Sequence, residues 1–308
     1  MAEPSPSGTR VDADHLLRLR HLVKHLPEPG LAASGRPGGF PTRRRGSGLD
    51  IRDVRAYADG DDFRHVDAMT TARTGRIHVR TFHDDRDKTA LLVADFRAPM
   101  LWGTRGRLRS VAAAEALALA GWRVITAGGR VGLMAFGGGG DVLFVAPRIR
   151  DRAMAEIAGG LQRMHERALA ERAGDTSLDE ALEQAGRLVP RGSTLFLATA
   201  LDDPGPGFED VMRSLRRRLS LEVLLVCDAF ERKPPPGTYP FFTAPGHVRR
   251  STVGLLRSAL SPDPRPSRLR ALGVTVRTVA TAATSLDMAR MLQHEMQEEM
   301  QEETMDER

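Results

Sequence analysis

Short apolar runs alternate with longer amphipathic stretches over the larger, second part of the chain. The apolar runs span residues 89–95, 131–136, 142–145, 194–199, 220–227 and 273–279. The stretches with helical spacing span residues 106–126, 148–170, 177–188, 207–218 and 284–298. Apolar strands separated by helices long enough to cross over favour a mostly parallel sheet covered on both faces. The pattern therefore predicts an α/β fold.

One pair of apolar runs lacks an intervening helix. In "VGLMAFGGGGDVLFVAP" two strands lie on either side of a glycine-rich turn. Such a short connection is typical of an antiparallel hairpin. We therefore expect one edge strand of the sheet to be antiparallel.

The first part of the chain follows different patterns. Residues 12–26 place leucine and valine at helical spacing until Pro27 ends the run. A segment rich in Gly, Pro and Arg follows, without a regular period. Residues 49–83 then alternate apolar and charged positions around an Asp-Gly turn. This order predicts an N-terminal helix, a loop and a small β module ahead of the α/β part.

The 308 residues exceed the usual length of one domain, and 41% of them are hydrophobic, as in globular proteins. No stretch reaches the roughly 18 to 20 apolar residues of a membrane span. The N-terminus lacks the apolar run of a secretory signal, so we expect a cytoplasmic protein. The single cysteine, Cys227, lies in an apolar strand-like run and is interpreted as a buried, inert thiol.

The basic character of the chain invites a nucleic-acid interpretation, since its pI is close to 10.0. Only three of the 45 basic residues are lysines, and acidic residues alternate with the arginines almost everywhere. The net charge is only +5. The composition therefore favours a chain without a nucleic-acid partner.

The common catalytic and metal-binding motifs are missing from the sequence. The stretch "FGGGGD" lacks the Lys-Ser or Lys-Thr of a phosphate loop, and a strand follows it instead of a helix. Neither H-E-x-x-H nor G-x-S-x-G occurs. We therefore predict no catalytic residues and no cofactor.

Acids and arginines alternate most densely in "YADGDDFRHVDAMTTARTGRIHVRTF". Its acids do not have the spacing of a calcium loop. Carboxylates among guanidinium groups suit bidentate pairs that hold a turn in place, and we favour that structural role. A hydrolase that uses the acidic cluster at residues 59–67 is the alternative.

This stretch, together with the following "TALLVADFRAPM", resembles the bacterial family called domain of unknown function 58. The hallmark of the family is Gly-Asp-Asp-x-Arg-x-x-Asp and then Ala-Arg-x-Gly, ahead of a von Willebrand factor A-like domain. The matching positions are Gly60, Asp61, Asp62, Arg64, Asp67, Ala72, Arg73 and Gly75. Ala68 departs from the family's usual tryptophan, and the resemblance covers about residues 46–200.

The resemblance implies a Rossmann-like, von Willebrand A-like sheet with one antiparallel edge strand. We accordingly divide the chain into residues 1–48 (helix and Gly/Pro/Arg-rich loop), 49–87 (β module), 88–298 (von Willebrand A-like domain) and 299–308 (acidic tail).

The same resemblance implies a place for a divalent cation, the metal-ion-dependent adhesion site, which this chain has in a degenerate form. Asp95 keeps the acid at the end of the first strand, and Thr176 keeps a threonine. Arg97 and Pro99 stand where the family of folds has serines, and Ala200 stands where it has an aspartate. Arginine only donates hydrogen bonds and proline has no side-chain ligand. We therefore expect the Arg97 guanidinium to pair with Asp95 in the place of the cation, without magnesium.

The resemblance also implies a non-enzymatic adaptor that works with a MoxR-type AAA+ ATPase, often encoded beside such proteins, and with other von Willebrand A proteins in complex assembly or maturation. The expected contact surface combines the site of Asp95, Arg97 and Thr176 with the arginine-rich loop 36–48. A divalent-metal-dependent binding module, with Asp95, Thr176 and Asp202 or Asp203 as ligands, is the other alternative.

Overall fold

A six-stranded sheet forms the centre of the protein. The structure is a computed structural model, and it describes residues 8–25, 45–58, 63–83, 89–137, 139–171, 176–232, 235–244, 247–253 and 263–293. The strands of the sheet are β3 (Thr89–Asp95), β4 (Arg130–Phe136), β5 (Val142–Arg148), β6 (Thr194–Thr199), β7 (Ser220–Cys227) and β10 (Thr275–Ala280). Their order is β10-β7-β6-β3-β4-β5, and only β5 is antiparallel to its neighbour. The predicted antiparallel edge strand is thus confirmed.

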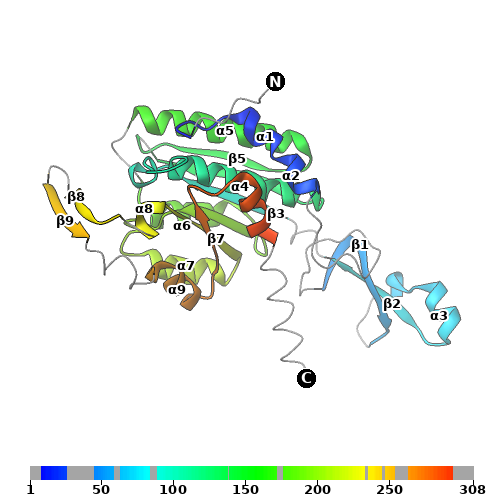
Figure 1. Ribbon diagram of the computed structural model, residues 1–308. Helices are drawn as coiled ribbons and strands as arrows, with labels where there is room; N and C mark the ends of the chain where they lie inside the picture. The colour runs from blue at the N-terminus through cyan, green and yellow to red at the C-terminus, as the bar shows by residue number, and fades with distance from the viewer. Residues whose placement is uncertain are drawn as a thin grey trace.

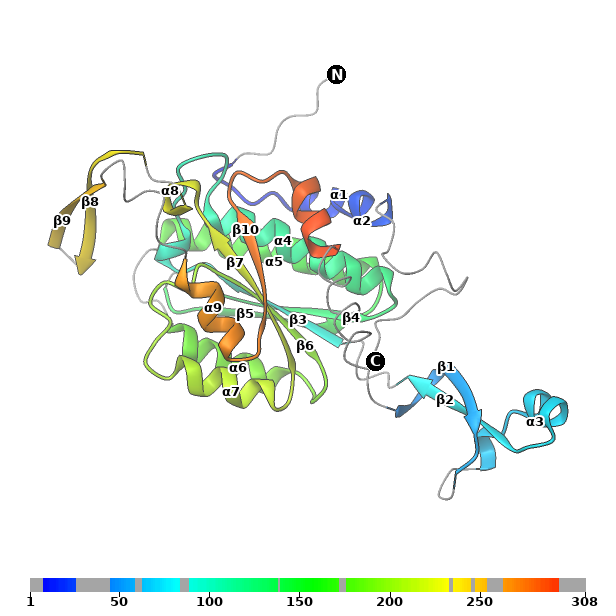
Figure 2. The same ribbon diagram turned by 60° about the horizontal axis from the view of Figure 1, so that its bottom comes forward.

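Helices cover both faces of this sheet (Figures 1 and 2). One face carries α1 (Ala13–Arg18), α2 (Arg20–His25), α4 (Arg109–Thr126), α5 (Asp151–Ala170) and a helix over residues 285–293. The other carries α6 (Leu178–Leu188), α7 (Phe208–Arg216) and α9 (Pro264–Ala271). The two faces have separate hydrophobic clusters, as expected for a parallel sheet that is buried on both sides.

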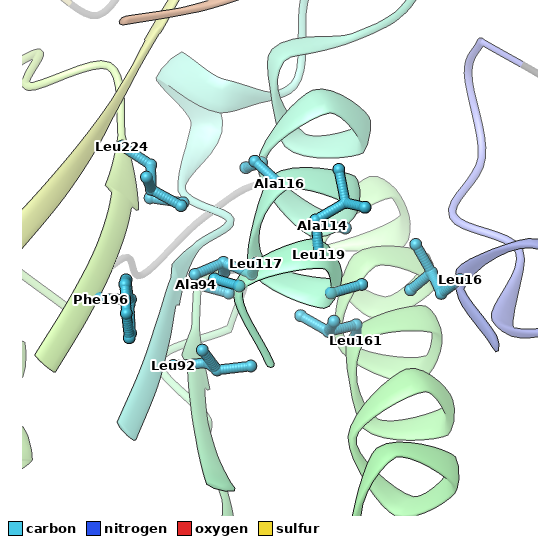
Figure 3. Close-up of a cluster of buried hydrophobic side chains, with 14 of the residues drawn as sticks. Leu16, Leu92, Ala94, Ala114, Ala116, Leu117, Leu119, Leu161, Phe196 and Leu224 are labelled. Atoms are coloured by element: carbon cyan, nitrogen blue, oxygen red, sulfur yellow. The ribbon is translucent and has the colours of Figure 1, made fainter. Parts of the chain in front are cut away.

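The core explains why the apolar runs are continuous. All seven residues of β3 are buried, because this strand has neighbours on both sides and helices on both faces. Figure 3 shows Leu92, Phe196 and Leu224 of three strands facing α4, with Leu161 of α5 and Leu16 of α1 beyond it. α4 thus lies between the sheet and other helices, and its apolar, alanine-rich sequence suits burial on nearly all sides.

Two further units extend from this body (Figure 2). The first contains β1 (Arg45–Ala56), the 3-10 helix η2 (Phe63–His65), α3 (Ala68–Thr74) and β2 (His78–His83). The second is the antiparallel hairpin of β8 (Gly237–Ala244) and β9 (His247–Val253), which follows the short helix α8 (Ala229–Arg232). The first unit corresponds to the predicted β module, with an additional helix and a strand that already begins at Arg45.

The predicted N-terminal helix is present as two short helices, α1 and α2. Within the described ranges, no helix combines the length and the apolar character that crossing a bilayer requires. The acidic tail at residues 299–308 lies outside the described residues.

His165 is a core residue. Its side chain is fully buried, and its Nε2 lies 3.0 Å from the Ser110 hydroxyl. Burial lowers the pKa of His165 to about 4. The imidazole is therefore neutral near pH 7 and joins α5 to α4 as an uncharged polar group.

Candidate functional site

Polar side chains gather at the edge where the parallel strands end. Asp95 ends β3 and Thr199 ends β6, whereas Asp228 and Thr281 directly follow β7 and β10. All four are buried. The chain leaves β3 for β4 on one side and returns to β6 on the other, and ligands of open α/β sheets bind where the strand order reverses in this way. This edge is therefore the candidate site.

A bidentate ion pair joins Asp95 to Arg97. The Arg97 Nε donates to Asp95 Oδ1 at 3.0 Å, and Nη2 donates to Oδ2 at 3.0 Å. The Arg97 backbone amide adds a third bond, to Oδ1, at 3.1 Å. Asp95 is 1% exposed and Arg97 is 5% exposed. The predicted pairing of the two side chains is confirmed, and it takes place away from solvent.

The guanidinium of Arg97 also holds the loop that follows β6. Its Nη1 donates to the Asp203 carbonyl at 2.9 Å, and its Nη2 donates to the Asp202 carbonyl at 3.1 Å. Leu201 and Asp203 in this loop have positive φ angles of 58° and 45°. A leucine rarely adopts such a conformation. The contacts to Arg97 offset this cost by fixing the loop around the positive charge.

Thr199 completes the surroundings of Asp95. Its hydroxyl donates to Asp95 Oδ2 at 2.7 Å and accepts from the Leu201 amide at 3.0 Å. Thr176, the threonine expected here, lies one residue before Ser177, the N-cap of α6. In the described part of the chain, the hydroxyl that bonds Asp95 is therefore that of Thr199.

Gly137 allows β4 to end beside the Asp95 loop. Its φ angle is +126°, and a Cβ atom at this position would lie 2.3 Å from the carbonyl carbon of Phe96. The backbone of Phe96 and Arg97 thus passes too close for any side chain. This packing places Arg97 over the ends of β3 and β6.

A second buried arginine, Arg109, continues the network. Its Nη1 donates to Asp202 Oδ2 at 2.6 Å and to the Pro99 carbonyl at 3.0 Å, and it also forms an ion pair with Glu231. The guanidinium carbon lies 4.0 Å from the centre of the Trp102 ring, which is a cation–π arrangement. Arg109 is 2% exposed. It thereby links the start of α4 to the loop after β6 and to α8.

Arg265 extends the network to α9. Its Nη2 contacts Glu231 at 2.6 Å and Asp263 at 2.8 Å, and its Nη1 donates to the Ala200 carbonyl at 2.7 Å. Burial alone would raise the pKa of Asp263, but hydrogen bonds from Arg265 lower it below its ordinary value. Cys227 lies beside this pair and is 2% exposed, so its predicted burial is confirmed.

Asp228 organises the ends of β7 and β10. Its carboxylate accepts from the backbone amides of Thr104 and Phe230, each at 2.9 Å, and from the Thr281 hydroxyl at 2.9 Å. The Thr104 hydroxyl donates a further bond. Burial alone would raise the pKa of Asp228, but these bonds lower it below its ordinary value. Asp228 therefore acts as an ionised anchor for three segments.

The residues around Asp95 do not fit a magnesium ion. Magnesium requires oxygen ligands in near-octahedral geometry. Both oxygens of Asp95 already accept bonds from Arg97, whose fixed positive charge repels a cation. Pro99 and Ala200 offer no side-chain oxygen. Among the described residues, moreover, no three His, Cys, Asp or Glu side chains are grouped to hold a metal.

The family motif lies in the β1–β2 unit, and two of its positions delimit a helix. Asp67 is the N-cap of α3, and its carboxylate accepts from the Thr70 amide at 2.7 Å. Gly75 is the C-cap, with a φ angle of 71°. Arg64 and Arg73 are exposed. Gly60, Asp61 and Asp62 lie outside the described residues, as does the part of loop 36–48 before Arg45.

Three important residues of the network were missed by sequence reasoning. Asp228 carries a signal that could have been used, because it ends an apolar run in the same way as Asp95. Arg109 carries none, since its partner Asp202 lies 93 residues away in the chain. Arg265 follows Asp263 by two residues, the spacing of Asp95 and Arg97, but its contact with Ala200 lies 65 residues away.

Solved structures and curated proteins both show similarity to this chain. A conserved hypothetical protein, BatB, from Bacteroides thetaiotaomicron is 14% identical, covers 66% of this chain and 98% of its own, and has a TM-score of 0.38. The proximal thread matrix protein 1 of the mussel byssus is 13% identical over 45% of this chain and 37% of its own, with a TM-score of 0.34.

Among curated proteins, one uncharacterized protein of Mycobacterium bovis and two of Mycobacterium tuberculosis strains are each 40% identical over 75 residues. The matched part is 23% of this chain and 24% of each relative. A family model matches residues 53–244, more than half of the chain. The chain therefore belongs to the family described as Protein of unknown function DUF58.

Proposed function

We propose that this protein is a non-enzymatic adaptor that binds a protein partner at the carboxyl edge of a von Willebrand A-like sheet, without a bridging metal ion. The partner that its family resemblance favours is a MoxR-type AAA+ ATPase in the cytoplasm. The observation that carries the proposal is the buried Asp95–Arg97 pair, because a fixed guanidinium beside Asp95 supplies the positive charge that a divalent ion would otherwise supply.

The strand order supports the von Willebrand A-like assignment. The parallel strands β10-β7-β6-β3-β4 are followed by one antiparallel edge strand, β5, as the resemblance implies. Asp95 then occupies the end of the first strand of that sheet. In a metal-dependent site an acid of the partner would complete the coordination of the ion. With Arg97 already neutralising Asp95, the partner needs no such acid.

Exposed acids beside the Asp95–Arg97 pair support a surface that binds its partner through carboxylates, without a metal ion. Asp203 is exposed, while its carbonyl accepts from Arg97. The Asp202 side chain is 42% exposed, although one of its oxygens binds Arg109. Buried arginines thus hold in place a loop that presents carboxylates to solvent. Such a fixed acidic loop suits a basic patch on the partner, because little conformational freedom is lost on binding.

Charge reversal at Asp203 tests this function. The Asp203→Arg variant should bind a MoxR-type ATPase from the same organism about tenfold more weakly than the unchanged chain, which corresponds to about 1.4 kcal/mol. The affinity is measured by surface plasmon resonance with the purified ATPase. The control is Asp151→Arg at the start of α5, where the side chain is 52% exposed. Because β5 is antiparallel, α5 begins at the opposite edge of the sheet from Asp95.

Binding of the Asp151→Arg protein should equal that of the unchanged chain. Equal binding by all three proteins would reject the proposed surface. No binding by the unchanged chain would reject the ATPase as the partner.

A further inference from the structure

The two edge strands of the central sheet differ in how well they are covered. At β10, Arg277 is 7% exposed, forms an ion pair with Glu222 and donates to the Met291 carbonyl of the last described helix. At β5, Phe144 is 42% exposed. Among the large apolar side chains that the described chain exposes, Phe144 is the one that belongs to the six-stranded sheet. Within the described residues, β5 is therefore the less covered edge.

The outer side of β5 offers backbone hydrogen bonds. In an antiparallel ladder, alternate residues of a strand direct both backbone groups away from their neighbour. Among the described strands only β4 pairs with β5, so the groups on the outer side of β5 have no strand to bond there. Pro147 lacks an N–H, and the pairing with β4 is irregular between Val145 and Arg148. The part of this edge that can pair with a further strand is therefore residues 142–146.

The two faces of β5 differ in their surroundings. Leu143 and Val145 pack against the hydrophobic cluster that includes α5, which lies next to β5 (Figure 1). Phe144 pairs in register with Met134, which belongs to the cluster on the other face. Ala146 is also exposed. Phe144 thus lies at the centre of the usable segment, with its exposed ring on the face opposite α5.

Exposed ion pairs lie at the two ends of β5, and their charges are in opposite order. At the start, Asp141 beside the strand binds Arg167 of α5. At the end, Arg148 of the strand binds Glu156 of α5 at 3.0 Å. The four side chains are 34–56% exposed. The acid is thus on the strand side at one end and on the helix at the other.

This reversed order makes the edge complementary to itself. A second copy whose β5 runs antiparallel brings the start of one strand to the end of the other. Asp141 then meets Arg148 of the copy, with opposite charges. On the helices, Arg167 meets Glu156 of the copy, again with opposite charges. A surface whose charges match those of its own rotated copy fits a two-fold interface.

We propose that two copies of this chain pair through the outer edges of β5, with a two-fold axis at Phe144, so that their six-stranded sheets continue into one another. The two Phe144 rings then lie side by side across the axis, as cross-strand aromatic pairs do. The contact closes at a dimer, because a two-fold interface uses the same edge of both copies. One short strand and one helix from each copy form a small interface, so we expect a dissociation constant in the micromolar range.

Sedimentation equilibrium of the full-length protein tests the dimer. The mass should rise from the 33.7 kDa of one chain towards twice that value as the concentration passes through the micromolar range. The Phe144→Lys variant puts like charges opposite each other at the axis and should stay monomeric. Its matched control, Phe63→Lys, changes a ring that is 64% exposed in the β1–β2 unit and should dimerise like the unchanged chain. The melting temperature of each variant shows whether it is folded.

A charge exchange tests the two ends of the interface. Asp141→Arg faces Arg148 of the copy and should weaken the dimer about tenfold. Adding Arg148→Asp restores opposite charges across the interface and should restore the dimer, which a folding defect could not do. Asp210→Arg is the control, because it breaks an exposed ion pair with Arg213 on α7, a helix that contacts β7 on the other half of the sheet. Its dimer should be as strong as that of the unchanged chain.

A cysteine at the axis tests the register. The native Cys227 is 2% exposed, so a new surface cysteine is the accessible thiol. Residues directly opposite in an antiparallel pair have Cα atoms about 4.5–5.5 Å apart, within the range that a disulfide spans. Under mild oxidation, the Phe144→Cys protein should form a covalent dimer, whereas the Phe63→Cys control should form much less of it.

Three outcomes would overturn the proposal. The first is an unchanged chain that stays monomeric at every concentration. The second is a dimer that Phe144→Lys leaves intact, since it would use another surface. The third is a double variant, Asp141→Arg with Arg148→Asp, whose dimer is as weak as that of Asp141→Arg alone.

Discussion

Replacing Asp95 by alanine should lower the free energy of unfolding by about 3–5 kcal/mol, because it removes the carboxylate that balances the buried Arg97 charge. The Thr199 hydroxyl and the Arg97 amide lose an acceptor in the same change. The effect can be measured by urea unfolding, provided that the transition of this long chain is two-state.

A double variant distinguishes the charge from the packing. Asp95→Ala combined with Arg97→Met removes both charges and should recover part of the lost stability, since the unbalanced buried charge is gone but the bonds from Arg97 to the Asp202 and Asp203 carbonyls are lost as well. As a surface control, Glu183→Ala breaks the exposed contact with Arg187 and should cost no more than about 1 kcal/mol. Equal, small losses for Asp95→Ala and Glu183→Ala would show that the buried pair does not hold this edge together.

The second large effect is expected at Asp228. Asp228→Ala should lower the free energy of unfolding by about 2–4 kcal/mol, because buried donors such as the Thr281 hydroxyl lose their acceptor. The hydrogen bonds that lower the pKa of Asp228 stabilise its ionised form. This contribution is complete above the ordinary carboxyl pKa, near 3.9, and is lost as the pH falls through the lower pKa of the folded state.

Urea unfolding of the Asp228→Ala and unchanged proteins at a series of pH values measures both aspects. The stability difference between them should be constant near pH 7 and should shrink in acid. Asp287, an exposed acid that accepts from Thr284, supplies the control, since Asp287→Ala removes a similar local bond outside the core. A difference for Asp228→Ala that grows in acid would contradict an ionised Asp228.

The central fold could be predicted because its signals are local. Each parallel strand is buried on both faces and reads as a continuous apolar run, of which β3 is the clearest case. The expected strand 194–199 and the observed β6 have the same bounds. The antiparallel edge could be predicted for a similar reason, since the connection between β4 and β5 is too short for a crossover helix.

The helices α3 and α9 were not predicted from the sequence, because their positions depend on capping residues or on tertiary contacts. α3 has seven residues and lies between Asp67 and Gly75, so its capping residues indicate it better than any apolar period. α9 carries little apolar periodicity, and only Leu269 is buried in it. Its position follows from the packing of that leucine under the sheet. A reading of periodicity alone cannot find such helices.

In the candidate site, too, contacts between residues close in the sequence could be predicted and contacts between distant residues could not. Asp95 and Arg97 are two residues apart, so their pairing could be inferred from chemistry and spacing alone. The loop around the guanidinium is more than 100 residues away, and its carbonyls leave no trace in the sequence. The threonine that bonds Asp95 could not be chosen from the sequence, because Thr176 precedes a helix and Thr199 ends a strand, and both places can lie at the carboxyl edge of a sheet.

A magnesium titration of the unchanged full-length protein tests most directly whether Arg97 takes the place of the cation. The melting temperature is followed while millimolar MgCl₂ or MnCl₂ is added, and NaCl of equal ionic strength corrects for screening. An ion present at 100 times its dissociation constant would stabilise the protein by about 2.7 kcal/mol. We expect the same melting temperature in divalent and monovalent salt, and a clear increase with magnesium or manganese would contradict the metal-free account.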